Sequence, residues 1–152
     1  MILSTKGRYA VMAMVELAMA DQGKPITLAY LAEKQEIPLA YLEQIFAKLK
    51  KSGLVESVRG PGGGYRLSQT PEQTLILDVI VAAEESIKMT RCGGDSHAGC
   101  MLPKTRCLTH DLWQGLTRHI EDYLQSVSLA DVCNRDLRPH RVPSELQSFL
   151  QA

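Results

Sequence analysis

The sequence predicts a mainly α-helical fold with one small β-hairpin. Three observations carry this prediction: an apolar run over residues 6–20, helix-spaced apolar residues over residues 36–53, and an alternating stretch interrupted by glycines over residues 54–68. The chain has 152 residues, of which 45% are hydrophobic and 22% charged. This is enough for one domain with its own core, or for a small domain plus an oligomerisation element.

The first half is predicted to contain three helices. Residues 6–20 form the first, and a second, short helix starts after Thr27, whose hydroxyl can cap it. The third places Leu42, Ile45, Phe46 and Leu49 on one face and ends at Gly53. Its other face carries Tyr41, Glu43, Gln44, Lys48 and Lys51. Two short helices with a tight connection are typical of a helix-turn-helix, although an ordinary surface helix gives the same pattern.

A β-hairpin is predicted to follow the third helix. Leu54, Val55 and Val58 precede a Gly-Pro-Gly-Gly-Gly turn, and Tyr65 and Leu67 follow it. A helix-turn-helix followed by a two-stranded wing is a winged helix. Arg59 at the tip is placed to enter a narrow minor groove, where the negative potential attracts a guanidinium. A nucleotide-binding glycine loop is a poor alternative, because the Gly-Lys-Ser/Thr signature is missing.

The charge distribution favours the first half of the chain as the face for nucleic acid. Residues 1–70 carry nine Lys and Arg against six Asp and Glu, and residues 71–152 carry eight against eleven, so the halves have net charges of +3 and −3. No apolar run reaches the roughly 20 residues of a membrane helix, and no secretory signal is visible. We therefore expect a cytoplasmic protein with no membrane partner.

The second half is predicted to contain two more helices. Thr74 can cap the first of them. The second, over residues 111–127, carries a stripe formed by Leu112, Leu116, Ile120, Tyr123, Leu124 and Val127. A stripe of this length suits a dimerisation helix, and the alternative is that it covers the domain's own core.

These predictions divide the chain into three parts. We expect a winged helix-turn-helix domain at 1–75 and a C-terminal tail at 134–152. Between them, residues 76–133 hold a linker helix, a cysteine-rich loop (91–110) and the dimerisation helix (111–127).

Three of the four cysteines and two of the four histidines lie within residues 92–110. In a reducing compartment such a cluster binds metal more often than it forms disulfides. Seven residues separate Cys92 from Cys100 and six separate Cys100 from Cys107, whereas structural zinc sites use two closely spaced pairs. From spacing alone, zinc and an iron-sulfur cluster remain equally good alternatives.

Several segments resemble the IscR family, the bacterial winged-helix regulators of iron-sulfur cluster assembly. The matching segments are KGRYAV, YLEQIFAKLKKSGLVESVRGPGGGYRL, RC at Arg91 and CLTHDLW at Cys107, and the resemblance covers about residues 1–130. It implies a homodimer that binds a palindromic operator in double-stranded DNA. It also implies a 2Fe-2S cluster with Cys92, Cys100, Cys107 and His110 as ligands. His97 lies in the same loop but outside the matched CLTH motif.

The resemblance further implies a transcription repressor or activator whose cluster state selects the operator class. Lys6, Arg8, Lys48 and Lys51 are expected on phosphates, and Tyr41, Glu43, Gln44 and Arg59 at bases or groove edges. Glu43 is the expected discriminator between operators. The other expected DNA-binding residues lie in the wing: Ser57, Gly60, Pro61, Gly62, Gly63, Gly64 and Tyr65.

The chain departs from the family pattern in two ways. Its cysteine loop is wider than usual, which puts the loop conformation in doubt, and Ala40 stands where the family has serine. The alternatives are a regulator of the same fold that senses nitric oxide, iron or thiol oxidation, a structural zinc site, and an electron carrier or accessory enzyme that merely holds a cluster. No catalytic triad or acid/base pair is visible, so we expect neither an enzyme nor a small-molecule substrate.

Overall fold

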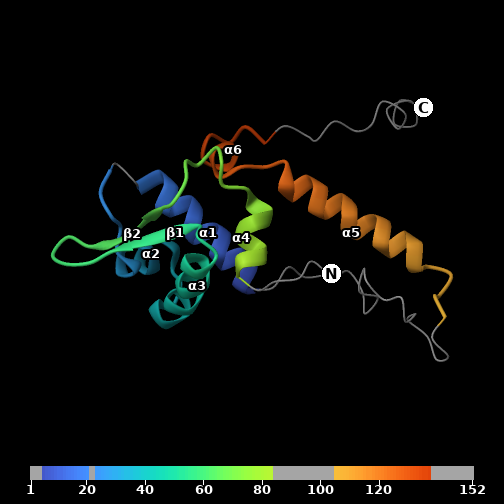
Figure 1. Ribbon diagram of the computed structural model, residues 1–152, viewed down its shortest axis with the longest axis horizontal. Helices are drawn as coiled ribbons and strands as arrows, with labels where there is room; N and C mark the ends of the chain where they lie inside the picture. The colour runs from blue at the N-terminus through green and yellow to red at the C-terminus, as the bar shows by residue number, and fades with distance from the viewer. Residues whose placement is uncertain (1–4, 21–22, 84–104, 138–152) are drawn as a thin grey trace.

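The computed structural model describes residues 5–20, 23–83 and 105–137. The elements, in chain order, are α1 (Thr5–Ala20), α2 (Leu28–Gln35), α3 (Leu39–Lys51), β1 (Val55–Val58), β2 (Gly64–Leu67), α4 (Ile76–Ala82), α5 (His110–Gln125) and α6 (Leu129–Cys133). All of them except α5 gather in one body, from which α5 projects (Figure 1). The predicted mainly α-helical fold with one hairpin is confirmed.

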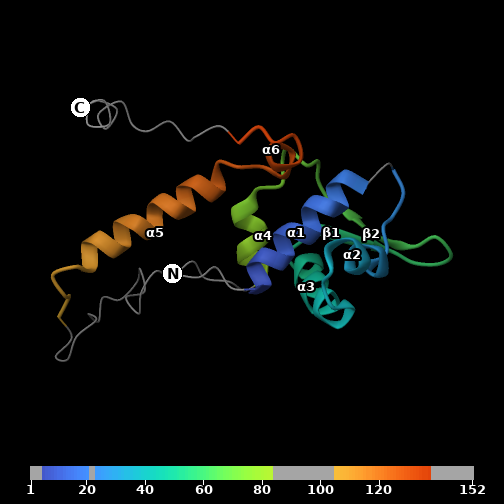
Figure 2. The same ribbon diagram turned by 180° about the vertical axis from the view of Figure 1, so that it is seen from behind.

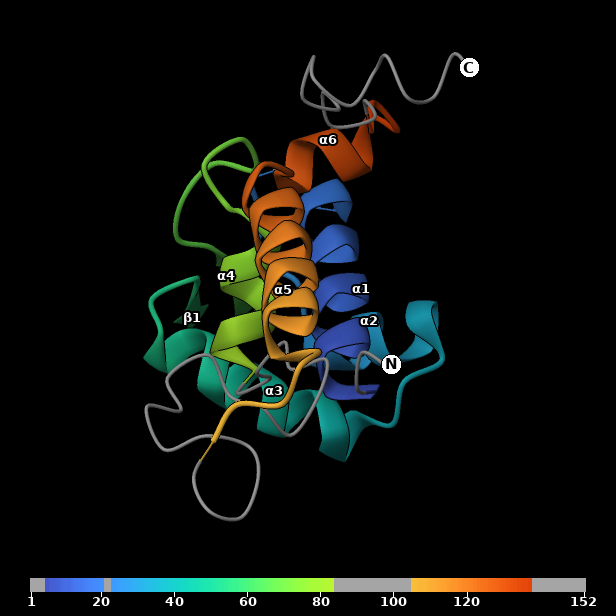
Figure 3. The same ribbon diagram turned by 90° about the vertical axis from the view of Figure 1, so that its right-hand side faces the viewer.

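Helix α1 lies at the centre of this body. Ala10, Ala13, Met14 and Leu17 are fully buried, and α1 packs against α2, α3, α4 and α6. Alanine at two of these positions lets neighbouring helices approach closely, which suits a helix with contacts on several faces. Figure 3 shows α1 and α4 running side by side behind α5.

The two helices of the predicted helix-turn-helix form as expected. Thr27 caps α2, because its Oγ1 accepts a hydrogen bond from the backbone N–H of Tyr30 at 3.2 Å. Glu36 then adopts a left-handed conformation, with φ of 52°, and turns the chain toward α3. The four apolar residues predicted to face inward on α3, Leu42, Ile45, Phe46 and Leu49, are all buried.

The hairpin follows α3 in the predicted place. Strands β1 and β2 are antiparallel, with Val55 opposite Leu67 and Val58 opposite Gly64. Ile26, just before α2, adds one further bridge, because it exchanges two backbone hydrogen bonds with Tyr65, at 2.8 and 2.7 Å. Seen from behind, the hairpin and α5 extend from opposite ends of the body (Figure 2).

Two of the wing glycines are required by close backbone contacts. A Cβ atom on Gly64 would lie 2.4 Å from the carbonyl oxygen of Ile26, and one on Gly63 would lie 2.3 Å from that of Val58. Any side chain at these positions would push neighbouring backbone apart. The glycine run is therefore needed to close the wing onto the segment before α2.

The predicted cap of α4 is wrong. Thr74 is buried, and its hydroxyl donates to the carbonyl oxygen of Thr70 at 3.1 Å. The N-cap residue is Leu75, which makes no side-chain cap. Instead, the extended backbone of Leu75 pairs with Ser128, a long-range contact that no local pattern could indicate.

The second half differs from the prediction at the end of α5. The helix stops at Gln125, so Val127 lies beyond it, in a buried connection to a short helix, α6, that we did not predict. Ser128 and Asp131 cap α6 reciprocally. None of the helices in the described part of the chain is long and apolar enough to cross a membrane.

Candidate nucleic-acid interface and metal ligands

The outer face of α3 presents most of the side chains predicted to bind DNA. Glu43, Gln44 and Lys51 are exposed, and Tyr41 and Lys48 are partly buried. Lys6 of α1, also exposed, shares a small pocket with Tyr41, Gln44 and Lys48, which Ile45 and Ala83 complete. Two ammonium groups beside an amide and a phenol suit contact with a phosphate of a nucleic-acid backbone.

Helix α1 also orients the start of α3. The rings of Tyr9 and Tyr41 meet edge to face, with centroids 5.5 Å apart. Arg8, the neighbour of Tyr9, is exposed. The first turns of α1 thus contribute one lysine beside α3, Lys6, and the ring of Tyr9 that packs on Tyr41.

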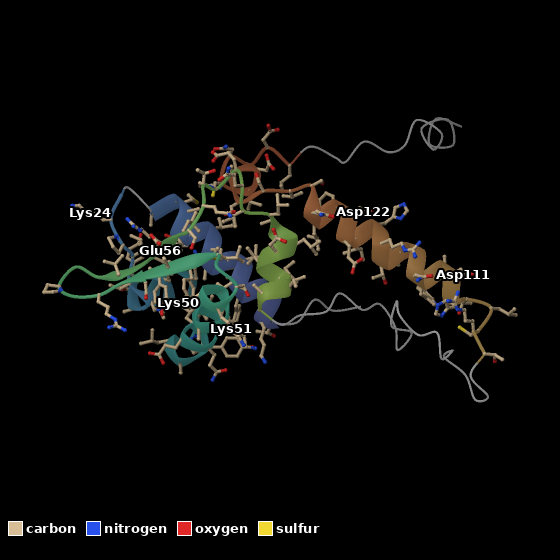
Figure 4. All side chains as sticks on the ribbon, in the orientation of Figure 1. Lys24, Lys50, Lys51, Glu56, Asp111 and Asp122 are labelled. Atoms are coloured by element: carbon tan, nitrogen blue, oxygen red, sulfur yellow. The ribbon has the colours of Figure 1, made fainter. Side chains whose placement is uncertain are left out.

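The wing supplies the second predicted set of DNA-binding residues. Arg59, Gly60, Pro61 and Gly62 are exposed at the turn. Ser57 of β1 accepts a hydrogen bond from Nζ of Lys50 at 2.6 Å, which ties the last turn of α3 to the wing. Figure 4 shows Lys50 and Lys51 at the end of α3 and Glu56 on the hairpin.

Tyr65 is more strongly engaged within the domain than the tip residues are. Its ring packs edge to face on buried Phe46, with centroids 5.0 Å apart, and its backbone pairs with Ile26. Gly63 and Gly64 lie in the same tightly packed part of the hairpin. These three residues hold the wing in place, whereas Arg59 and its neighbours form the exposed surface.

Two of the four predicted metal ligands are described by the structure. Cys107 is half-buried and His110, the first residue of α5, is only 2% exposed. The backbone N–H of His110 donates to the carbonyl oxygen of Cys107 at 3.0 Å, so both residues belong to one turn. Cys92 and Cys100 lie outside the described residues. Within the described ranges no group of three or more His, Cys, Asp or Glu side chains is placed to hold a metal ion.

The turn that carries Cys107 and His110 lies far from α3 and the wing. In Figure 4, Asp111 marks the distant end of α5 and Asp122 lies close to the body. The apolar stripe of α5 is largely open: Leu112 is 63% exposed and Leu116 is 37% exposed. An amphipathic helix with such a face is typical of a surface that another chain covers.

Sequence reasoning missed several residues that shape this region. The prediction assigned a role to Lys51 but none to Lys50, which bonds to Ser57. No local pattern indicates this contact, because the two residues are seven apart and lie on different elements. Glu56 and Arg66 form a cross-strand ion pair on the wing. A Glu and an Arg on opposite sides of a predicted hairpin could have indicated this pair.

Comparison with known proteins identifies the family. Residues 3–135 match the Rrf2 family, described as an iron-dependent transcriptional regulator. The chain is 49% identical over 132 residues to the HTH-type transcriptional regulator IscR of Aliivibrio salmonicida, covering 87% of this chain and 77% of that protein. It is 48% identical over 134 residues to IscR of Photorhabdus laumondii, covering 88% and 80%.

Solved structures agree with these sequence matches. The structure of T. potens IscR matches with a TM-score of 0.72 and 33% identity, over 97% of this chain and 96% of that one. CymR, described as the global cysteine regulator of B. subtilis, matches with a TM-score of 0.73 and 30% identity, over 89% and 98%. The relatives are transcriptional regulators, as predicted for this chain. The chain therefore belongs to the Rrf2 family of iron-dependent transcriptional regulators.

Proposed function

We propose that this transcription regulator selects its DNA operators according to the state of a 2Fe-2S cluster. The observation that carries the proposal is the position of Cys107 and His110, which share one turn at the far end of a helix rooted in the DNA-binding body. A change in the conformation of that turn can be passed along α5 to the body. The names of its relatives, IscR among them, support a role in iron-sulfur cluster biogenesis.

DNA binding is assigned to the face formed by α3, the N-terminus of α1 and the wing. Lys6 and Lys48 converge on one pocket and are proposed to hold a phosphate, with Arg8 and Lys51 on neighbouring ones. Glu43 and Gln44 point outward from α3 and are proposed to meet base edges. Arg59 enters the minor groove from the wing.

Glu43 is proposed to select between operators. A carboxylate near DNA is repelled by phosphates unless a cytosine amino group donates a hydrogen bond to it. It therefore weakens binding to operators that lack such a partner. Replacing Glu43 with Ala should relax operator choice, and unchanged selectivity in gel shifts would reject this role.

The cluster is assigned to Cys92, Cys100, Cys107 and His110. The donor set fits, because three soft thiolates and an imidazole suit an iron-sulfur centre. The positive end of the α5 dipole next to Cys107 also favours a thiolate-bound, negatively charged group. When bound, the cluster would make the protein responsive to redox conditions. A neutral imidazole in place of one thiolate would raise the reduction potential of the cluster.

The chain is proposed to act as a homodimer through α5. The exposed faces of Leu112, Leu116 and Tyr123 would be covered by the same helix of a second copy. Two copies related by a two-fold axis present two copies of α3 and two wings. This arrangement matches a palindromic operator.

The decisive experiment is anaerobic purification followed by an absorption spectrum and by iron, sulfide and zinc analysis. We expect coloured protein with equal amounts of iron and sulfide, and loss of both in the Cys107→Ser variant. Cys133→Ser is the matched control, because Cys133 lies on α6, outside the assigned ligand set. Colourless protein that contains zinc, or that takes up no iron on reconstitution, would reject the cluster.

DNA binding is tested separately on duplexes selected from a random library by the cluster-loaded and the cluster-free protein. The proposal requires that the two forms enrich different sequences. If both forms enrich the same sequences, the cluster does not select the operator. The result would then favour a DNA-binding regulator that responds to another signal, such as thiol oxidation. Enrichment by neither form would favour an electron carrier.

A further inference from the structure

We infer that Glu16 of α1 is a positioning residue for DNA binding. Its carboxylate holds α2 against α1 and thereby sets the angle at which α3 meets DNA. The inference depends on the proposed DNA-binding function and adds a residue outside the DNA-binding face.

Glu16 bonds to two side chains of α2. Oε2 accepts a hydrogen bond from Nε2 of Gln35 at 2.8 Å, and Oε1 accepts a longer one from the hydroxyl of Tyr30 at 3.4 Å. Both oxygens of one carboxylate are therefore used by α2. Glu16 itself is partly buried, in a helix whose other inward residues are apolar. A carboxylate in such a helix requires partners, and α2 provides them.

Gln35 lies at the position where a contact with α1 can affect the direction of α3. It is the last residue of α2, and Glu36 after it adopts the left-handed conformation that turns the chain into α3. A non-glycine residue persists in this conformation only when its surroundings determine it. The bond to Glu16 fixes the residue directly before the turn, so it constrains the direction in which α3 leaves.

Helix α1 touches α3 on the same face. Tyr9 and Glu16 are seven residues apart, or about two helical turns, and so lie on one side of α1. Tyr9 packs on Tyr41 at the start of α3, while Glu16 holds Gln35 at the end of α2. One contact therefore holds the end of α2 and the other holds the start of α3, on the two sides of the turn between them.

Helix α1 is also held by the second half of the chain. Helices α4 and α6 both pack on α1, and Sγ of Cys133 lies 3.9 Å from the carbonyl oxygen of Val15, the neighbour of Glu16. Helix α1 therefore contacts both the helix-turn-helix and the two helices next to α5 in the chain. Glu16 adds a polar contact next to the turn to the apolar packing that already joins α1 to α2 and α3.

A reciprocal exchange of the two partners tests the inference. Gln35→Glu places two carboxylates together and should break the contact, whereas Glu16→Gln with Gln35→Glu restores a hydrogen bond with donor and acceptor exchanged. The control combines Glu33→Gln with Gln35→Glu, because Glu33 is exposed on the same helix. This control has the same net charge as the exchanged pair but lacks its bond.

Affinity is measured for the full-length chain on a duplex enriched from a random library by the wild-type protein. One hydrogen bond of ordinary net strength corresponds to about a fivefold change in an equilibrium constant. We expect Gln35→Glu to weaken binding by up to about this factor, the exchanged pair to recover most of the loss, and the Glu33 control to recover none. Equal recovery of affinity by both double variants would overturn the inference, because it would show that net charge and not the hydrogen bond determines the affinity.

Backbone amide exchange of residues 33–41 in the free protein provides a measurement that does not involve DNA. We expect faster exchange in Gln35→Glu and in the Glu33 control than in the wild type and the exchanged pair. An unchanged rate of amide exchange in Gln35→Glu would show that the bond between Glu16 and Gln35 does not stabilise the turn. Wild-type protein that enriches no DNA would overturn the proposed function, whereas enriched DNA bound equally by all four proteins would overturn the role of Glu16 alone.

Discussion

Leu75 and Ser128 pair as an isolated antiparallel bridge, which joins the residue before α4 to the residue before α6. Two backbone hydrogen bonds flank it, from Ile76 to Val127 and from Leu129 to Thr74, both at 2.9 Å. The bridge forms a joint that holds the segment after α5 against the start of α4. The C-terminal end of α5 is therefore connected to the body through paired backbone.

Replacing Ser128 with Ala should destabilise this joint. Ser128 Oγ accepts a hydrogen bond from the backbone N–H of Asp131 at 3.1 Å, and Asp131 accepts one from the backbone N–H of Ser128 at 2.8 Å. Loss of a helix cap costs about 1 kcal/mol of unfolding free energy. Denaturant unfolding of the variant measures this loss, with Ser68→Ala, at an exposed position, as the control. Equal stability of the two variants would show that the cap contributes nothing.

The wing glycines should differ in their tolerance of alanine. Gly62 has φ of 75°, and a Cβ atom there would have no other atom within 4 Å, so Gly62→Ala should cost only the backbone strain, about 1 kcal/mol. Gly64→Ala would place a Cβ 2.4 Å from the carbonyl oxygen of Ile26 and should cost about 3 kcal/mol or more. Thermal unfolding of both variants checks the order. The reverse order would mean that the Ile26 bridge does not hold the wing.

Local sequence patterns predicted most of the fold, but they did not predict the pairing of Leu75 with Ser128. The spacing of Leu42, Ile45, Phe46 and Leu49 predicted α3 because burial on one face is a local, periodic signal. The predicted cap at Thr74 is wrong because the helix begins one residue later than the apolar run suggests, after Leu75, whose extended backbone pairs with the distant Ser128. The sequence Ser-Leu-Ala-Asp at 128–131 did carry a capping signal, which could have revealed α6.

The candidate site was predictable to a different degree in each part. Motifs predicted roles for Cys107, His110 and the residues on α3, because those patterns are contiguous in the chain. The grouping of Lys6 with Lys48, and the contact of Glu16 with Gln35, depend on how α1 crosses the helix-turn-helix. Such a crossing is set by packing among distant segments, which a single sequence does not encode in any short pattern.

Lys48 should contribute one phosphate contact. Each phosphate neutralised by a cation contributes about 0.9 to the slope of the logarithm of the binding constant against the logarithm of the salt concentration. Lys48→Ala should therefore reduce the slope by about 0.9, on selected and unselected duplexes alike. Arg118→Ala is the control, since Arg118 is exposed on α5. An unchanged slope for Lys48→Ala would remove Lys48 from the interface.

The thiol of Cys133 should react slowly with iodoacetamide. Burial raises the pKa of Cys133, and a backbone hydrogen bond opposes that shift. A raised pKa leaves less thiolate at pH 8, and the thiolate is the nucleophile. Mass spectrometry of the cluster-free protein should therefore show slower alkylation of Cys133 in the folded chain than in urea, with the difference narrowing as the pH rises toward 10. Equal rates at pH 8 would contradict this expectation.

Leu116→Glu should convert the proposed dimer into monomers. Leu116 is 37% exposed in a single chain, and a carboxylate at this position would have to be buried without a partner if a second copy covered α5. Sedimentation equilibrium should report the 16.8 kDa monomer, and binding to a palindromic duplex should weaken far more than binding to a half-site. Arg118→Glu introduces the same side chain on the opposite face of α5 and should remain dimeric. Dimers of the Leu116 variant, with unchanged DNA binding, would exclude this face of α5 as the interface and require another surface to pair the two copies.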